Sequence, residues 1–367
     1  MLETNDNTQP IGRIILPQKI GPYRFQEQIG AGSTSEVYKV INDGLEGVFC
    51  CKVVSKKKFV DQLSIEHFRS ELVTLEQTNH PNIVGLIDLF QDSLNFYIIT
   101  EYCEGGSLDK FIISQGKIEE GLARKVFLQV LEGLNHLHTK GISHRDIKAE
   151  NVFICDNFTI KLGDFGFASG RDDLLKTYCG TLTYCSPEVM NRIPYDGKKA
   201  DMWSCGILLY TMVTGRFPWT VRNQAAICEQ VKSGYIGTPS GVSTECIELI
   251  HMLTQLSPDN RPTCSEAIRH KWLHNIQKPL LPIANHQSNS SHKLDEIFEQ
   301  KNGWRIKIPT IPKQPFLKAE NDVQLLLKVC SRFPKRRKSE SRTLLNPISS
   351  SNNDTFPDAT KRAFTFI

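Results

Sequence analysis

The chain has 367 residues, a formal net charge of +4, and 40% hydrophobic and 23% charged residues. This is the composition of a globular protein, and the length allows about two or three domains. No stretch reaches the roughly 20 apolar residues that span a bilayer, and the opening MLETNDNTQP lacks the basic and then apolar pattern of a secretory signal. We therefore expect no membrane span and a cytoplasmic location, with access to the nucleus.

Eleven cysteines are scattered through apolar stretches and show no paired C-x-x-C spacing. Such spacing is typical of zinc sites, whereas a reduced cysteine packs as a small apolar side chain. We expect most of them to be reduced core residues of an intracellular protein.

Charge and composition change at about residue 275. Residues 275–367 carry sixteen basic and eight acidic side chains, or +8, which leaves −4 for the remainder. This tail is rich in proline, serine and asparagine, so we expect it to be mostly disordered, with helical spacing at residues 319–333. Its basic run at residues 335–338 contains no aromatic residue, so we expect no nucleic-acid partner, and a tail-binding protein partner stays open.

Residues 23–101, which follow an N-terminal extension (1–22), are typical of short strands. Helical spacing occurs once in this region, at residues 64–79. The predicted strands cover residues 23–30, 35–42, 48–56, 86–92 and 96–102.

From residue 107 the apolar spacing is mostly helical. The sequence therefore predicts an α+β protein, in which a small, mostly β lobe (23–101) precedes a larger, mostly α lobe (107–274). The predicted helices cover residues 119–141, 198–215, 223–234, 243–256 and 265–275.

Two glycines, Gly30 and Gly32, lie between the first two predicted strands. Because they have no Cβ, their backbone N–H groups can approach an anion such as a phosphate. An ordinary β-hairpin turn explains the same residues equally well.

Lys52 lies in the apolar strand 48–56, where an unpaired ammonium would be costly to bury. Glu71 is the expected partner, because its neighbours Phe68 and Leu72 mark the apolar face of the helix at 64–79. An ordinary ion pair between strand and helix accounts for this pairing as well as a functional site does.

The stretch HRDIKAENVFICDNFTIKLGDFG, residues 144–166, concentrates acids, bases and an amide around two short predicted strands, 152–154 and 160–162. Folding alone does not require this density of functional groups. The groups in question are Asp146, Lys148, Asn151 and Asp164.

The order of motifs over residues 23–275 resembles that of the eukaryotic protein kinase family. The motifs are a glycine-rich hairpin, a strand lysine, a helix glutamate, H-R-D-x-K-x-x-N, D-F-G and S-P-E. The segment CGTLTYCSPE and the lysine after the H-R-D aspartate resemble its serine/threonine branch. The general texture is most similar to the calcium/calmodulin-dependent and AMP-activated group. The resemblance implies the bilobal protein kinase fold over residues 23–274 and transfer of the γ-phosphate of ATP to serine or threonine hydroxyls of protein substrates.

The resemblance also implies how the nucleotide is held. Lys52, paired with Glu71, would contact the α- and β-phosphates of ATP under the loop that contains Gly30, Ala31 and Gly32.

For the transfer itself, Asn151 and Asp164 would hold Mg²⁺ through oxygen atoms. Asp146 would orient the substrate hydroxyl and accept its proton, and Lys148 would neutralise charge on the transferred phosphoryl group.

Adenine would bind at the junction between the lobes. The family pattern places Thr100 at the gatekeeper position and uses backbone groups of Glu101 and Cys103 to hydrogen-bond the base. Four apolar side chains would form the walls of the pocket, although each could equally be an ordinary core residue: Ile29, Val37, Cys50 and Phe153.

Three positions depart from the family pattern. Ser35 replaces the third loop glycine, and Ser186 replaces the alanine of A-P-E. Cys50 replaces the alanine that stands two residues before the strand lysine. Each exchange is small for small, so we expect at most modest effects on nucleotide affinity.

The family pattern also implies architectural contacts. Thr181 would hydrogen-bond near Asp146 and Lys148, and Asp201 would reach the backbone of the H-R-D segment. Glu188 and Arg261 would form a buried pair.

Regulation is predicted at Thr177, in the activation segment. An arginine beside the catalytic aspartate, here Arg145, leaves a positive pocket that a phosphate on this segment fills. We predict that an upstream kinase activates the protein by phosphorylating Thr177, and the alternative is a loop threonine that is never modified.

Substrate preference is predicted from acidic positions. In basophilic members of the protein kinase family, acidic residues contact basic residues that precede the phosphoacceptor. Glu150 and Glu229 match two of these positions, although Ser107 occupies a position where a third acid is common. We predict a moderate preference for arginine or lysine before the target residue. In the tail, Arg336 precedes Ser339 by three residues, and self-phosphorylation or pseudosubstrate docking is a conjecture from this spacing.

Two other classes of function stay open. A binding-only pseudokinase would keep the fold as a scaffold, but the intact catalytic and metal positions named above argue against it. A small-molecule phosphotransferase is disfavoured by the activation segment, residues 177–188, and the helices after it.

Overall fold

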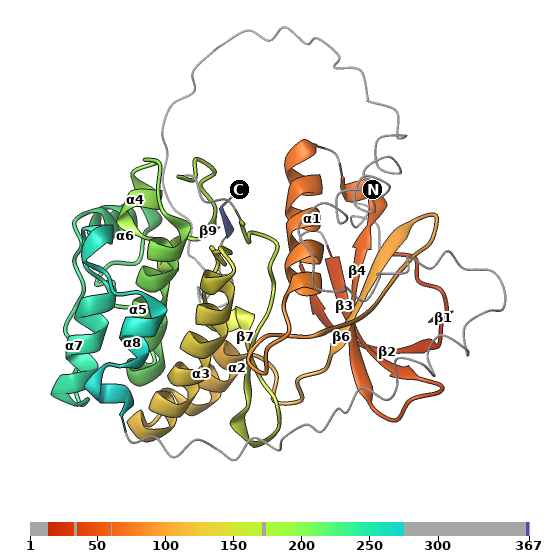
Figure 1. Ribbon diagram of the computed structural model, residues 1–367, viewed down its shortest axis with the longest axis horizontal. Coiled ribbons are helices and arrows are strands. Elements are labelled where there is room, and N and C mark those ends of the chain that lie inside the picture. Colours follow the sequence, from red (N-terminus) through yellow and green to blue (C-terminus); the bar gives the residue numbers. More distant parts are fainter. Residues whose placement is uncertain (1–13, 33–34, 60, 171–173, 275–364, 367) are drawn as a thin grey trace, which may run out of the picture.

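A computed structural model describes residues 14–32, 35–59, 61–170, 174–274 and 365–366. Figure 1 shows a small lobe of strands with one helix beside a larger, helical lobe. The predicted α+β, bilobal arrangement is confirmed.

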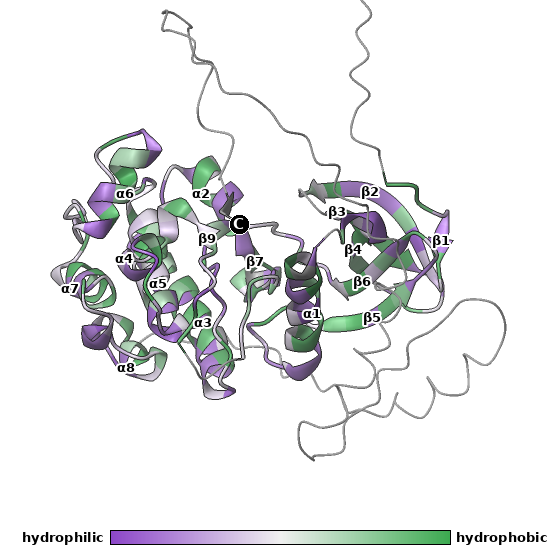
Figure 2. Cartoon of the chain, turned by 90° about the horizontal axis from the view of Figure 1, so that it is seen from above, coloured by the Kyte–Doolittle hydropathy of each residue, from purple (hydrophilic) through white to green (hydrophobic). Residues whose placement is uncertain are grey.

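A six-stranded antiparallel sheet forms the small lobe, in the order β1-β2-β3-β4-β6-β5. Its inward-facing residues, such as Val40 and Cys51, are fully buried, and Figure 2 shows β5 and β6 as mostly hydrophobic. The strands are β1 (Lys19–Ile20), β2 (Tyr23–Ala31), β3 (Ser35–Asn42), β4 (Val48–Ser55), β5 (Leu86–Gln91) and β6 (Asn95–Glu101).

Helix α1 (Gln62–Gln77) packs against this sheet. It begins after Asp61, whose carboxylate accepts a hydrogen bond from the Ser64 N–H at 2.8 Å, and such caps contribute about 1 kcal/mol. Leu72 is buried in the core that the helix shares with β5 and β6, which directs Glu71 on the same face inward.

The large lobe is built around α5, which is buried along most of its length, as expected for a helix that is apolar on all sides. Helices α3 and α7 pack against it, and α8 packs against α3. The helices are α2 (Leu108–Gln115), α3 (Glu120–Thr139), α4 (Pro187–Met190), α5 (Gly197–Thr214), α6 (Gln224–Lys232), α7 (Thr244–Leu253) and α8 (Cys264–Ile268).

The hairpin of β7 (Val152–Ile154) and β8 (Ile160–Leu162) lies in the large lobe, at the junction with the small one. Both strands have their predicted bounds. Two backbone hydrogen bonds tie the connecting segment to β7, from the Gly105 N–H to the Ile154 oxygen at 2.9 Å and from the Ile154 N–H to the Gly106 oxygen at 2.8 Å. The hairpin therefore holds its flanking polar residues next to the connection between the lobes.

The predicted helix at 265–275 differs from the structure. Helix α8 ends at Ile268, and a separate 3₁₀ turn covers Lys271–Leu273. The break lets Trp272 enter the core, where its Nε1–H donates a hydrogen bond to Glu120 Oε1 at 2.7 Å. This long-range contact outweighs the local helical pattern.

The helix expected at residues 319–333 and nearly all of the basic tail lie outside the described residues. Two residues near the C-terminus form β10 (Thr365–Phe366), which pairs antiparallel with β9 (Gly180–Thr181). Among the helices that are described, none has both the length and the apolar character needed to cross a membrane.

Candidate active site

Lys52 connects the two lobes through ion pairs. Its Nζ lies 2.6 Å from Glu71 Oε1 on α1 and 3.4 Å from Asp164 Oδ1, which follows β8. The predicted pairing of Lys52 with Glu71 is confirmed, and the lysine also contacts the acid of D-F-G.

The protonation of this group follows from its surroundings. Burial lowers the pKa of Lys52, but the carboxylates of Asp164 and Glu71 outweigh it and raise the pKa above its ordinary value. Lys52 in turn lowers the pKa of Asp164. Burial raises the pKa of Glu71, and Lys52 offsets this only in part.

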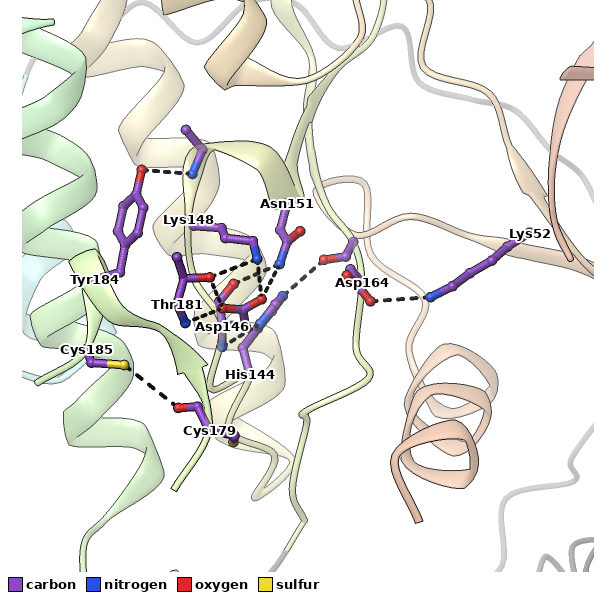
Figure 3. Close-up of polar contacts among 12 residues, drawn as sticks. Lys52, His144, Asp146, Lys148, Asn151, Asp164, Cys179, Thr181, Tyr184 and Cys185 are labelled. Carbon is purple, nitrogen blue, oxygen red and sulfur yellow. Dashed lines mark hydrogen bonds and ion pairs between the residues drawn. The ribbon is translucent and has the colours of Figure 1, made fainter. Parts of the chain in front are cut away.

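Asp146 lies at the centre of a second cluster (Figure 3). Its Oδ2 lies 2.7 Å from Lys148 Nζ and accepts a hydrogen bond from Asn151 Nδ2 at 3.1 Å. Its Oδ1 accepts hydrogen bonds from the backbone N–H of Thr181 at 3.1 Å and from the hydroxyl of Thr181 at 3.0 Å. Four donors thus fill the usual acceptor positions of one carboxylate, and an incoming hydroxyl has to displace one of them.

The backbone of the H-R-D segment is fixed by Asp201 of α5. Its carboxylate accepts the N–H groups of His144 at 2.8 Å and Arg145 at 2.7 Å, as predicted. Arg145 has a φ of 68°, a left-handed conformation that is unfavourable for this residue type. These hydrogen bonds to a buried carboxylate hold the backbone in that conformation and so place Asp146.

Asn151 and Asp164 carry oxygen atoms that suit a magnesium ion. The Asn151 Nδ2 also donates to the Asp146 backbone oxygen at 2.9 Å, so its amide nitrogen is engaged and its Oδ1 is turned away from Asp146. Asp164 uses Oδ1 for Lys52, and its side chain is 47% exposed. Figure 3 shows Asp164 between the Asp146 cluster and Lys52. Carboxylate and amide oxygens are the ligands that Mg²⁺ prefers, so these residues fit the ion.

The residues of the expected nucleotide site that lie on β3, β4 and β6 share one face of the small-lobe sheet. Directly paired residues in an antiparallel sheet lie on the same face, and the register pairs Gly30 with Val37, Val37 with Lys52, and Cys50 with Thr100. Since Cys50 and Lys52 are two residues apart, these positions form a continuous surface.

The expected walls of the pocket are less buried than the core behind them. All four are half-buried: Ile29, Val37, Cys50 and Phe153. Phe153 belongs to the large lobe, where it bridges to Ser107, whereas the other three lie on strands of the small lobe.

The glycine-rich segment is a hairpin between β2 and β3. The Gly32 N–H donates to the Ser35 backbone oxygen at 2.8 Å, which closes the turn with serine at the third glycine position. Ala31 ends β2, and residues 33–34 at the tip lie outside the described residues. The hairpin alternative and the phosphate-loop prediction are both compatible with this geometry.

Thr177 is exposed beside Arg145. The Arg145 guanidinium donates to the Thr177 backbone oxygen, and so does the hydroxyl of Tyr195 at 3.0 Å. The backbone of Thr177 is therefore held next to a positive charge.

Glu188 and Arg261 form the predicted buried pair. Their two hydrogen bonds measure 2.6 and 2.8 Å, and the side chains are 4% and 0% exposed. The bidentate geometry identifies this pair as architectural.

Two acids near the cluster each have one buried carboxylate oxygen without a hydrogen-bond partner within the described residues. These oxygens are Asp109 Oδ1 and Glu150 Oε2. Burial raises the pKa of Glu150, and the negative charges of Asp109 and Asp146 add to this effect. Glu229, in contrast, is exposed and lies 3.0 Å from Lys232 on its own helix. Asp109 was not predicted as a site residue, because its proximity to Glu150 arises from the tertiary packing of helix α2 and has no local signal in the sequence.

The sequence matches the protein kinase domain family over residues 23–273. The chain belongs to the protein kinase family. The kinase is 32% identical over 77% of its length to CBL-interacting serine/threonine-protein kinase 3 of Arabidopsis thaliana, covering 65% of that protein. It is 35% identical to serine/threonine-protein kinase kin-29 of Caenorhabditis elegans (70% of this chain, 31% of the relative) and 32% identical to serine/threonine-protein kinase cds1 of Schizosaccharomyces pombe (76% and 63%).

These relatives agree with the resemblance to the serine/threonine branch and to its calcium/calmodulin-dependent and AMP-activated group. The kinase spans about two thirds or less of the length of the curated relatives it matches.

Proposed function

We propose that the protein is a serine/threonine protein kinase that transfers the γ-phosphoryl group of ATP to hydroxyls of protein substrates. The observation that carries this proposal is the cluster of Asp146, Lys148, Asn151 and Thr181 next to the ion pairs of Lys52. A proton acceptor, two lysine ammonium groups and the oxygens proposed to bind metal therefore lie close together between the lobes.

Nucleotide binding uses the face of the small-lobe sheet. Lys52, kept protonated by Glu71, contacts the phosphates, and adenine lies between the half-buried walls contributed by both lobes. The Cys103 backbone N–H has no hydrogen-bond partner within the described residues and is a donor for the base. Asn151 and Asp164 hold Mg²⁺, which supplies charge neutralisation when bound.

In the transfer, the substrate oxygen forms a bond to the γ-phosphorus while the bond from that phosphorus to the β,γ-bridging oxygen breaks, which releases ADP. The hydroxyl replaces one donor of Asp146, and Asp146 receives its proton. Lys148 stabilises the negative charge on the moving group. Thr181 bonds both Asp146 and Lys148 and so fixes their relative position.

Radiolabelled phosphate transfer from Mg·ATP tests the proposal. Purified protein is offered a basic serine/threonine peptide, the same peptide with tyrosine, and a small-molecule alcohol, with Asp164→Ala as the control. Transfer to the first peptide alone, lost in the variant, is the expected result. ATP binding without transfer, even after an upstream kinase has modified Thr177, would replace the proposal by the pseudokinase scaffold, and transfer to the alcohol alone by a small-molecule phosphotransferase.

The substrate preference we propose is for arginine or lysine before the target residue. The acids Asp109 and Glu150 support it, because their negative charges lie close to each other and to Asp146, and a negative surface favours a basic residue of the substrate. Replacing the basic residue by alanine is expected to lower kcat/KM about 10- to 100-fold, the effect of one charged hydrogen-bonded contact. Glu150→Gln and Glu229→Gln are each expected to reduce this discrimination, whereas Glu248→Gln, which breaks an exposed pair with Lys271, is not. Equal rates for both peptides with the wild type would refute the preference.

We also propose that phosphorylation of Thr177 activates the kinase. The contact of Arg145 with the Thr177 backbone places a charged partner for the phosphate. After treatment with an upstream kinase the wild type is expected to gain activity, Thr177→Ala is expected not to, and the exposed control Thr220→Ala is expected to gain it normally. A full gain by Thr177→Ala would show that the idea is wrong.

Protein substrates, an upstream activating kinase and a tail-binding partner are the partners we propose. The tail conjecture at Arg336 and Ser339 lies outside the described residues. Deleting residues 276–367 with no change in rate or phosphate incorporation would remove it.

A further inference from the structure

Two cysteine sulfurs meet at the connection between the lobes. The Sγ atoms of Cys103 and Cys155 are 2.7 Å apart, about 0.65 Å longer than the roughly 2.05 Å of a disulfide bond. Both thiols are free. Among the ten cysteines that the structure describes, no other pair has its sulfurs in hydrogen-bond contact.

The fold brings these residues together through main-chain pairing. The segment that follows Cys103 runs antiparallel to β7, with Gly105 and Gly106 bonded to Ile154. The pairing is close, because a Cβ on Gly105 would lie 2.8 Å from the Ile154 oxygen. Cys103 precedes the paired segment by two residues and Cys155 directly follows Ile154, so this pairing brings the two cysteines to the same end of β7.

The two thiols differ in environment. Cys103 is 9% exposed, whereas Cys155 is half-buried and accessible at the end of β7. The hydrogen bond with Cys103 lowers the pKa of Cys155, burial opposes this, and the ammonium of Lys161 adds to the lowering. The same hydrogen bond and burial raise the pKa of Cys103. Lys161 also lies 2.9 Å from Glu101, the other residue that we place at the adenine edge. This arrangement makes Cys155 the more readily deprotonated of the two thiols and places the Cys103 sulfur within reach of it.

We propose that Cys103 and Cys155 are a redox modification site, at which a peroxide converts the two thiols into a disulfide that ties the inter-lobe connection to β7. The Cys155 thiolate attacks one oxygen of hydrogen peroxide, the O–O bond breaks, and hydroxide leaves, so that Cys155 becomes a sulfenic acid. The Cys103 sulfur then attacks the Cys155 sulfur, the S–O bond breaks, and water leaves with the thiol proton. In balance, two thiols and one hydrogen peroxide give one disulfide and two waters.

The modification affects the nucleotide, a consequence that rests on the proposed function. A disulfide pulls Cys103 toward β7, and therefore moves its backbone N–H away from the base. We expect ATP affinity to fall about three- to tenfold, as when one hydrogen bond is weakened, and to recover after reduction with dithiothreitol.

The test titrates the reduced, full-length chain with hydrogen peroxide, blocks remaining thiols with N-ethylmaleimide, and maps cross-linked peptides by mass spectrometry. The expected product is a Cys103–Cys155 cross-link at a lower peroxide dose than any change at Cys228, a half-exposed thiol on α6. Cys155→Ser forms no cross-link, Cys228→Ser forms it like the wild type, and Lys161→Met forms it more slowly because the thiolate loses its nearby cation. Oxidation that leaves both thiols unlinked overturns the proposal.

ATP binding is measured on the same samples. Weaker binding by the cross-linked protein, reversed by dithiothreitol and absent in peroxide-treated Cys155→Ser, is expected. Unchanged binding by the cross-linked protein would overturn the effect on the nucleotide. Failure of the proposed function is recognised separately, because a reduced protein without ATP binding or transfer would still form the cross-link.

Discussion

Two carboxylate–cation pairs use similar contacts for different purposes. Lys52 and Glu71 lie 2.6 Å apart in the cleft, with the lysine side chain 23% exposed. Glu188 and Arg261 also lie 2.6 Å apart, but inside the large lobe with almost no exposure. The cleft pair has a third member, Asp164, on the other lobe, and it is therefore available to a ligand, whereas the buried pair is closed.

The two pairs also differ in what remains when one partner is removed. Without Lys52, Glu71 can take up a proton, and burial already raises its pKa. Without Glu188, Arg261 keeps its charge, because a guanidinium does not lose its proton in a protein. The cleft pair therefore tolerates changes that the buried pair does not.

The largest effect is expected at the centre of the cleft. Asp146→Asn removes the proton acceptor and unpairs Lys148, which lies 2.7 Å away. We expect kcat to fall by about 10²- to 10⁴-fold, the usual contribution of such a group. Steady-state phosphate transfer measures it, with the exposed Asp156→Asn as the control. A fall of less than tenfold would contradict the role given to Asp146.

Next in size is the buried pair. Glu188→Gln leaves the Arg261 charge buried without its partner, and we expect the free energy of unfolding to fall by about 3 to 5 kcal/mol. Urea denaturation measures this change. The matched control is Glu248→Gln, which breaks an exposed pair with Lys271 and should cost about 1 kcal/mol or less. Similar losses in the two variants would mean that burial does not distinguish the pairs.

Lys52→Met is expected to have a smaller effect on stability, about 1 to 2 kcal/mol, which is typical of a single substitution, because the buried Glu71 that loses its partner can take up a proton. A carboxyl group whose pKa is raised in the folded state binds more protons there than in the unfolded chain. Stability therefore falls as pH rises from the unfolded pKa through the folded pKa. We expect the deficit of Lys52→Met in urea denaturation to grow as pH rises above the ordinary pKa of a glutamate, because the pKa of Glu71 is raised in the folded state, while that of Glu188→Gln stays constant. A loss of stability in Lys52→Met that does not change with pH would show that the Glu71 carboxylate does not take up a proton.

The contrast also shows what the sequence could predict. The Lys52–Glu71 pair followed from the cost of burying a lone charge, and the bounds of β3, β7 and β8 followed from apolar alternation and turn residues. The break after α8 was not predictable, because Trp272 leaves the helical pattern to reach Glu120, 152 residues away in the chain.

In the candidate site, the resemblance placed the residues, and the structure added how they are held. The four donors on Asp146, the unpaired oxygen of Asp109 and the contact of Cys103 with Cys155 all depend on tertiary pairing. None of these contacts has a spacing in the chain that would reveal it.

The most direct measurement compares single-turnover phosphate transfer by Lys52→Met and Glu188→Gln, each at a temperature where circular dichroism shows it to be folded. We predict that folded Lys52→Met loses transfer and that folded Glu188→Gln retains a rate close to that of the wild type. Transfer by Lys52→Met at the wild-type rate would contradict the assignment of the cleft pair to phosphate binding and, with it, the proposed active site.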